Sequence, residues 1–135
     1  MNADLIHRMA RATLAGDLPF PDIVGHLLAQ GVEYYRVDYA AGQMVFYNGA
    51  GSSIVAPLKL DGLPAVAADF DAPALQAAIL DSQHHGQKFR QFSERAVRAG
   101  VQGYYAFLRG QRVVYLGRQG DQHTEWFPGA RPKAD

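Results

Sequence analysis

An internal similarity between the two halves of the chain constrains its fold more than any other feature of the sequence. Residues 31–35 read GVEYY and residues 100–104 read GVQGY, so the two segments match at a spacing of 69 residues. The same spacing aligns Phe20 with Phe89, each at the start of an amphipathic segment.

A second pair of matching segments follows in the same order. Residues 42–49 read GQMVFYNG and residues 110–117 read GQRVVYLG, which match at a spacing of 68 and align Tyr47 with Tyr115. The lost residue falls in the turn between the blocks, where deletions are tolerated. Matches in one order predict a duplicated unit, and the alternative is two ordinary helix-to-hairpin units.

A chain of 135 residues has the length of one domain with one hydrophobic core. Its 48% hydrophobic and 19% charged residues are typical of a globular protein. We therefore expect a single domain over 1–135, with a first repeat of about 1–70 and a second repeat of about 71–135.

Each half contains two helical patterns and then three strand patterns. Apolar residues recur with the helical period, between caps and glycines, at about 3–15, 21–30, 72–82 and 87–99. Short strands are expected at 33–39, 43–48, 53–58, 104–109, 112–116 and 123–127. Pro57 cannot donate to a sheet, so the third strand is expected at an edge. The sequence thus predicts an α+β fold of two tandem ααβββ-like repeats, forming an antiparallel sheet with helices packed on one face.

The hairpin turns predict which strand residues share a face of the sheet. A three-residue turn at 41–43 would pair Asp38 with Phe46, and a Gly-Asp turn at 120–121 would pair Arg118 with His123. Strand side chains alternate between faces, so one face becomes the core. That face is expected to hold Tyr35, Val37, Tyr39, Val45, Tyr47, Tyr104, Ala106, Leu108, Val113, Tyr115, Thr124 and Trp126.

The opposite face is the candidate functional surface, because it mixes charged side chains with apolar ones. It is expected to hold Phe46, Asn48, Tyr105, Phe107, Val114, Leu116 and the candidate ligand or partner residues Arg36, Asp38, Arg118, His123, Glu125 and Phe127. A partner subunit in a homodimer or a small polar ligand would cover such a face. The alternative is that its charges form exposed ion pairs with no further role.

His123 and Glu125 lie two residues apart on one expected strand and therefore point the same way. A carboxylate beside an imidazole orients the ring for acid or base chemistry. No nucleophile accompanies them in the sequence pattern. The leading hypothesis is therefore a non-enzymatic binding or interaction module, and the alternative is a small hydrolase or isomerase with His123 as general base.

The composition argues against several classes of function. Thirteen basic residues balance thirteen acidic ones, so we expect no nucleic acid partner. The chain has no cysteine, and its five histidines lack ligand spacing, so we expect no metal and no cofactor. No apolar run reaches the ~18 residues of a membrane span, so we expect no membrane partner and a cytoplasmic location.

Two motifs resemble those of a known family. Residues 31–38 fit Gly-Val-x-x-Tyr-x-Val-Asp, and residues 117–128 fit Gly-Arg-x-Gly-x-x-His-x-Glu-x-Phe-Pro. A Gln-x-Gly segment corresponds to Gln83 and Gly86, with two histidines between them here. The chain therefore resembles the YbcV-like family of small bacterial and prophage proteins, a domain of unknown function also labelled phage-envelope-like. The resemblance implies an α+β fold and no established activity.

Overall fold

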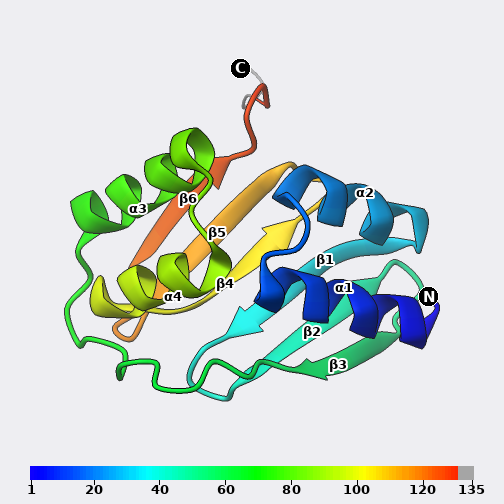
Figure 1. Cartoon of the computed structure of the whole chain (residues 1–135), viewed down its shortest axis with the longest axis horizontal. Helices are drawn as coiled ribbons and strands as arrows, with labels where there is room; N and C mark the ends of the chain where they lie inside the picture. The colour runs from blue at the N-terminus through cyan, green and yellow to red at the C-terminus, as the bar shows by residue number, and fades with distance from the viewer. Residues whose placement is uncertain (131–135) are drawn as a thin grey trace.

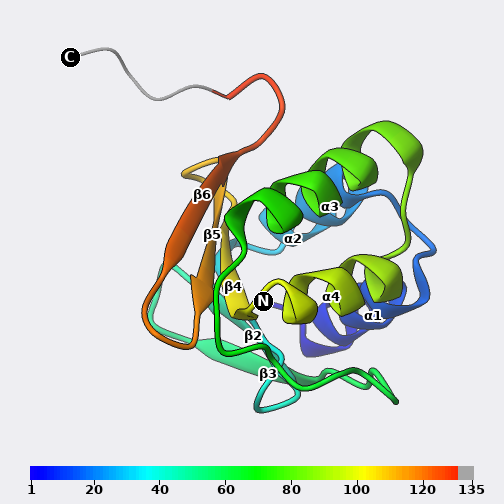
Figure 2. The same ribbon diagram turned by 90° about the vertical axis from the view of Figure 1, so that its left-hand side faces the viewer.

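Four helices lie on one face of a six-stranded antiparallel sheet in the computed structural model, which describes residues 1–130 (Figures 1 and 2). The edge-on view in Figure 2 places all four helices on the same side of the strands. The predicted α+β class and the one-sided helix layer are confirmed. Among residues 1–130, no helix has the length and apolar character that a bilayer span requires.

Each half of the described chain runs helix, helix, strand, strand, strand. The helices are α1 (Ala3–Ala15), α2 (Phe20–Ala29), α3 (Ala72–His85) and α4 (Phe89–Arg98). The strands are β1 (Val32–Asp38), β2 (Gln43–Asn48), β3 (Ser53–Pro57), β4 (Val101–Phe107), β5 (Arg112–Gly117) and β6 (Gln122–Trp126). Every element of the second half begins 69 residues after its counterpart in the first half.

Side-chain caps and left-handed glycines set the ends of α1 and α3. The carboxamide of Asn2 accepts a hydrogen bond from the backbone N–H of Leu5, and the carboxylate of Asp71 accepts one from Ala74. Gly16 and Gly86 end the two helices in the left-handed conformation. Helix α3 reaches His85, and is therefore longer than the expected 72–82.

The strand order is β3-β2-β1-β4-β5-β6, so β1 and β4 join the two halves at the centre of the sheet. In that antiparallel pair Arg36 lies opposite Tyr105. Strand β3, which ends at Pro57, lies at an edge as predicted. The β1–β2 and β4–β5 pairs each contain a register irregularity at the same place, next to Val32 and next to Val101.

Two predicted hairpin registers are wrong. Asp38 pairs with Gln43 rather than Phe46, and His123 pairs with Tyr115 rather than Arg118. Each register differs from the expected one by three residues. An odd shift moves every side chain of the strand to the opposite face.

Turn geometry explains the first of these errors. The β1–β2 turn spans the four residues between Asp38 and Gln43, and Gly42 adopts a φ of +69° there. The β4–β5 turn places Gln111 in the same role with a φ of +56°, the one positive φ of a non-glycine residue within 1–130. The β1–β2 turn is therefore one residue longer than the three-residue turn expected at 41–43. The expected alignment of Tyr47 with Tyr115 is also wrong. Tyr35 corresponds to Tyr104, and the residues paired with these two are Phe46 and Tyr115. Tyr115 therefore corresponds to Phe46.

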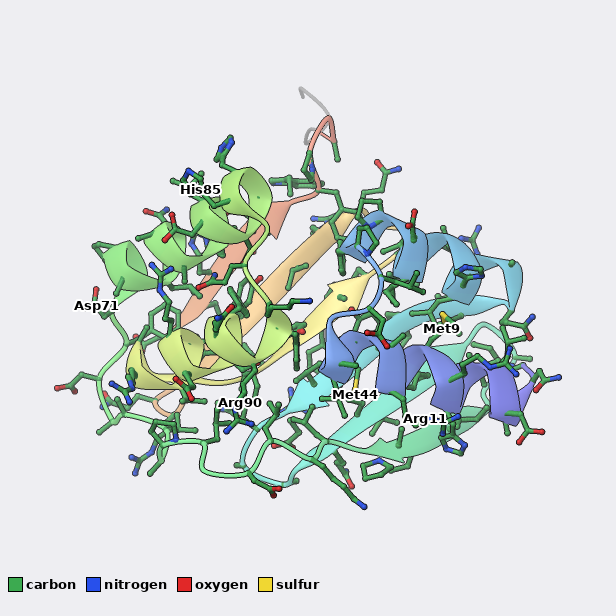
Figure 3. The ribbon with its side chains drawn as sticks, viewed as in Figure 1. Met9, Arg11, Met44, Asp71, His85 and Arg90 are labelled. Carbon is green, nitrogen blue, oxygen red and sulfur yellow. The ribbon has the colours of Figure 1, made fainter. Side chains whose placement is uncertain are left out.

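The core fills the space between helices and sheet. Met9 of α1 and Met44 of β2 are both buried in it (Figure 3). Burial raises the pKa of Tyr39, whose hydroxyl lies 2.9 Å from that of buried Ser93. The corrected registers put Phe46, His123 and Glu125 on the helix-covered face, and Val45, Tyr47, Thr124 and Trp126 on the uncovered face.

Candidate functional site

The six candidate residues do not share one face of the sheet. Arg36 and Asp38 lie on the uncovered face of β1, which we call the open face. His123 and Glu125 lie on the helix-covered side of β6, beside Tyr115. Arg118 lies in the β5–β6 turn and Phe127 follows β6. The placement on a single surface was wrong because the β5–β6 register differs from the predicted one.

Arg36 lies at the centre of the open face and makes three polar or π contacts. Its guanidinium is 3.5 Å from the carboxylate of Asp38 and donates to the Gln102 side chain at 3.4 Å. The same group lies 4.9 Å from the ring centroid of Tyr105, within cation–π range. The side chains of Arg36 and Asp38 are only 16% and 21% exposed, so this pair is better shielded than an ordinary surface ion pair.

Four aromatic side chains lie next to one another on the open face, and one of them, Tyr105, contacts Arg36. We call Tyr34, Tyr47, Tyr105 and Phe107 the aromatic cluster. The Tyr34 ring stacks on Tyr47 at 4.6 Å and lies 5.7 Å from Phe107, while Tyr105 lies 5.8 Å from Phe107. Partial burial and the neighbouring tyrosines Tyr105 and Tyr34 raise the pKa of Tyr47. The cluster therefore forms a continuous ring surface across β2, β1 and β4.

The open face continues onto the two outer strands of the second half. The guanidinium of Arg112 lies 4.2 Å from the ring centroid of Trp126. Val114 and Leu116 on β5 are partly buried and lie opposite Tyr105 and Gly103 of β4. Tyr47 and Trp126 were expected in the core but lie on the open face, and Tyr34 was not among the expected candidates. The alternation of Tyr34 with Arg36 and Asp38 was the available signal for it.

His123 and Glu125 form a separate polar pair on the helix side. The imidazole Nε2 lies 3.0 Å from a carboxylate oxygen of Glu125, and the two side chains are 15% and 32% exposed. The imidazole lies 6.3 Å from the ring of Tyr115, whose pKa is raised chiefly by burial. The pair has the geometry of an oriented acid–base couple.

Arg118 and Phe127 contact other parts of the chain. Arg118 donates a 3.1 Å hydrogen bond to the backbone carbonyl of Val66, in the connector between β3 and α3. Phe127 packs edge-to-face on Phe20 at the start of α2, with ring centroids 5.3 Å apart. Neither residue contacts the Arg36–Asp38 pair. Glu125 pairs with His123 and not with Arg118.

A further polar cluster joins α3 to α4 near His85 (Figure 3). Arg95 donates to Asp81 at 2.6 Å and to the side chain of Gln87 at 3.1 Å. The hydrogen bond from Arg95 lowers the pKa of Asp81. These hydrogen bonds join α4 to α3 and to the loop between them, so the cluster fastens the two helices.

Within residues 1–130, no three histidine, aspartate or glutamate side chains are grouped closely enough to hold a metal ion. In comparisons with known proteins, no family model and no curated protein sequence matches the chain. The resemblance to the YbcV-like family therefore stays a prediction.

Proposed function

We propose that this protein is a non-enzymatic interaction module and that its open face binds a second copy of the chain. The observation that carries the proposal is the aromatic cluster, which lies on the side of the sheet opposite the four helices. A large contiguous apolar surface on a monomer marks an interaction site. Val55 on β3 extends the apolar surface to the edge and is 53% exposed.

The dimensions of the sheet suit a dimer. Six strands at about 4.8 Å spacing and about 20 Å length give a projected face of roughly 580 Å² per copy. Two such faces bury about 1,200 Å² in total, without the extra accessible area that protruding side chains add. This area reaches the size range of specific interfaces.

The charges on the open face suit a second copy. A two-fold interface brings the same patch from both copies together, so the patch has to complement itself. Arg36 and Asp38 supply one cation and one anion near the centre of the face. Two facing copies pair these charges across the interface without leaving either one unmatched.

Single-stranded RNA is the competing occupant, because RNA also stacks on aromatic residues of open sheets. The charges disfavour it here. The chain has a net charge of zero, Asp38 would face the phosphates, and Arg36 and Arg112 already contact aromatic rings. The absence of a nucleic acid partner and the cytoplasmic location remain predictions.

The dimer is tested by introducing a charge on the open face. We expect Val114→Lys to raise the dimer dissociation constant at least tenfold, because the ammonium group would be desolvated at an apolar interface. Analytical ultracentrifugation from low to high micromolar concentration measures this constant. Val55→Lys is a second variant with less risk to folding, since Val55 is already 53% exposed.

The matched control is Leu80→Lys on α3, a residue that is 50% exposed on the helix side. It should leave the dissociation constant unchanged. A wild-type protein that stays monomeric at high micromolar concentration overturns the proposal. Binding of a single-stranded RNA oligonucleotide to that monomer, weakening as salt rises, would assign the open face to nucleic acid instead.

We also infer that the two halves are copies of one unit, the first over about 1–70 and the second over about 71–135, whose last five residues lie outside the described part. The constant 69-residue spacing of element starts supports this. So do the matching irregularities at Val32 and Val101, and the positive φ shared by Gly42 and Gln111.

The second candidate function is a small hydrolase or isomerase with His123 as general base. It is supported by a comparison of β6 with β3, its counterpart in the first half. Counting 69 residues back, His123 and Glu125 occupy the positions of Ile54 and Ala56. Ala56 is buried and Ile54 packs against the core. A polar pair in place of two apolar residues suggests a use other than packing.

For this second candidate we expect His123→Ile combined with Glu125→Ala to be at least as stable as the wild type. Replacing a shielded polar pair by apolar residues is often neutral or stabilising. Thermal denaturation at neutral pH measures the change. A loss of more than about 2 kcal/mol would show that the pair is structural, and the general-base hypothesis would lose its support.

A further inference from the structure

A hollow lies at the end of the sheet, away from the aromatic cluster. Its volume is about 780 Å³, within the range of small-molecule sites. Three segments surround it: the β1–β2 turn, the β5–β6 turn and the connector 58–71. The connector runs from β3 past α4 to α3 along one edge of the molecule (Figure 1).

The connector is longer than the ~4–6 residues of most connections, and long irregular connections are usually functional. Side chains and backbone groups hold it at both ends of the hollow. Arg90 donates to the carbonyl of Asp61, near the labelled Arg90 in Figure 3, and Ala67 N–H donates to the carbonyl of Val97. The connector is therefore a fixed wall of the hollow.

Apolar and polar groups contribute about equally to the exposed surface of the hollow, and most of its lining residues have apolar side chains. The connector contributes leucine, proline, alanine and valine side chains, and α4 contributes Val97. The polar lining side chains are Tyr39, Gln102 and Arg118. Gln102 is already engaged, because it donates to the carbonyl of Gly117 at 2.9 Å and accepts from Arg36. Tyr39 is also engaged with Ser93.

Among the described residues that line the hollow, Arg118 is the one that carries a charge. Its Nη1 donates to the carbonyl of Val66, and a guanidinium carries five N–H donors in all. Donors therefore remain for a second acceptor. A planar guanidinium matches a carboxylate, which accepts two parallel hydrogen bonds from it.

We propose that this hollow binds a small molecule with an apolar body and one carboxylate group. The carboxylate pairs with Arg118, and the apolar body lies against Leu58, Leu60, Leu63 and Val66. A cationic ligand is disfavoured, because its ammonium group would face the guanidinium of Arg118 and the described lining residues include no acidic side chain. The proposal is independent of the dimer, which uses the other side of the sheet.

Three probes of equal chain length test the charge requirement: octanoate, octan-1-ol and octylammonium. Isothermal titration calorimetry on the whole protein should show octanoate binding at least tenfold more tightly than octylammonium, with octan-1-ol between them. Equal binding of all three probes, or no octanoate binding at millimolar concentration, overturns the proposal.

Variants locate the site. Arg118→Gln should weaken octanoate at least tenfold and leave octan-1-ol unchanged, whereas Arg118→Lys should retain part of the preference for octanoate. Arg11→Gln is the matched control, since Arg11 lies exposed on α1 (Figure 3) and is not among the residues that line the hollow. Leu63→Trp fills the hollow and should abolish binding of all probes, which keeps the test decisive if Arg118→Gln loosens the connector. Unchanged octanoate affinity in both Arg118→Gln and Leu63→Trp would place binding elsewhere.

Discussion

Gly100→Ala should lower the free energy of unfolding by roughly 2–5 kcal/mol, because two separate costs coincide at this position. Gly100 adopts a φ of +91°, a conformation that disfavours any residue with a Cβ atom. An added Cβ would also overlap the backbone carbonyl of Asp69 in the connector. The backbone cannot rotate away as a flexible side chain can, since the N–H of Asp71 is bonded to the carbonyl of Ala99.

The matched control is Gly31→Ala in the first half. Gly31 precedes β1 as Gly100 precedes β4, and it has a φ of +80° with no atom within 4 Å of an added Cβ. Only the conformational cost applies there, about 1–2 kcal/mol. Urea denaturation of both variants measures the difference. Equal losses would mean that the connector does not press on Gly100.

Phe46→Ala should cost about 3–5 kcal/mol, the usual range for removing a buried phenylalanine from a core. Phe46 is 1% exposed, and its ring packs 5.3 Å from that of Tyr35 under the helices. Its truncation leaves a cavity that the surrounding sheet and helices fill only in part. The loss should appear in both thermal and urea denaturation of dilute protein.

Tyr47→Ala is the neighbouring control on the opposite face. It removes the stack on Tyr34 and some partial burial, and should cost about 1–2 kcal/mol in dilute protein. The two variants together report which face of β2 is the core. If Tyr47→Ala proved the more destabilising of the two, the β2 register would be the one that the turn pattern first indicated.

Local signals in the sequence were enough to predict the elements. Asn2 and Asp71 cap the helices that follow them, and the expected strands overlap the observed ones with shifts at their ends. Pro57 marked an edge strand because it lacks a donor. Each of these features depends on a few neighbouring residues, so it can be inferred without knowledge of distant parts of the chain.

The candidate site was predicted less well, because it depends on register. The turns at 41–43 and 120–121 have compositions that suit short loops, yet both hairpins use longer ones. Strand β6 reads Gln-His-Thr-Glu-Trp, so polar residues point to both faces of the sheet. The pattern therefore does not indicate which alternate residues face the helices. His123 and Glu125 were therefore assigned to the wrong face, while Arg36 and Asp38 were assigned to the right one.

The sequence by itself determined the α+β class, the order of helices and strands and the residues that cap them, because these follow from side-chain period and local hydrogen bonding. Only the tertiary structure decided that β1 pairs with β4, which brings Tyr34 of one half beside Phe107 of the other. Nothing local distinguishes this pairing, since an unpaired strand edge offers the same N–H and C=O groups to any other edge. The choice is made by the helices of both halves burying their apolar sides against one continuous sheet.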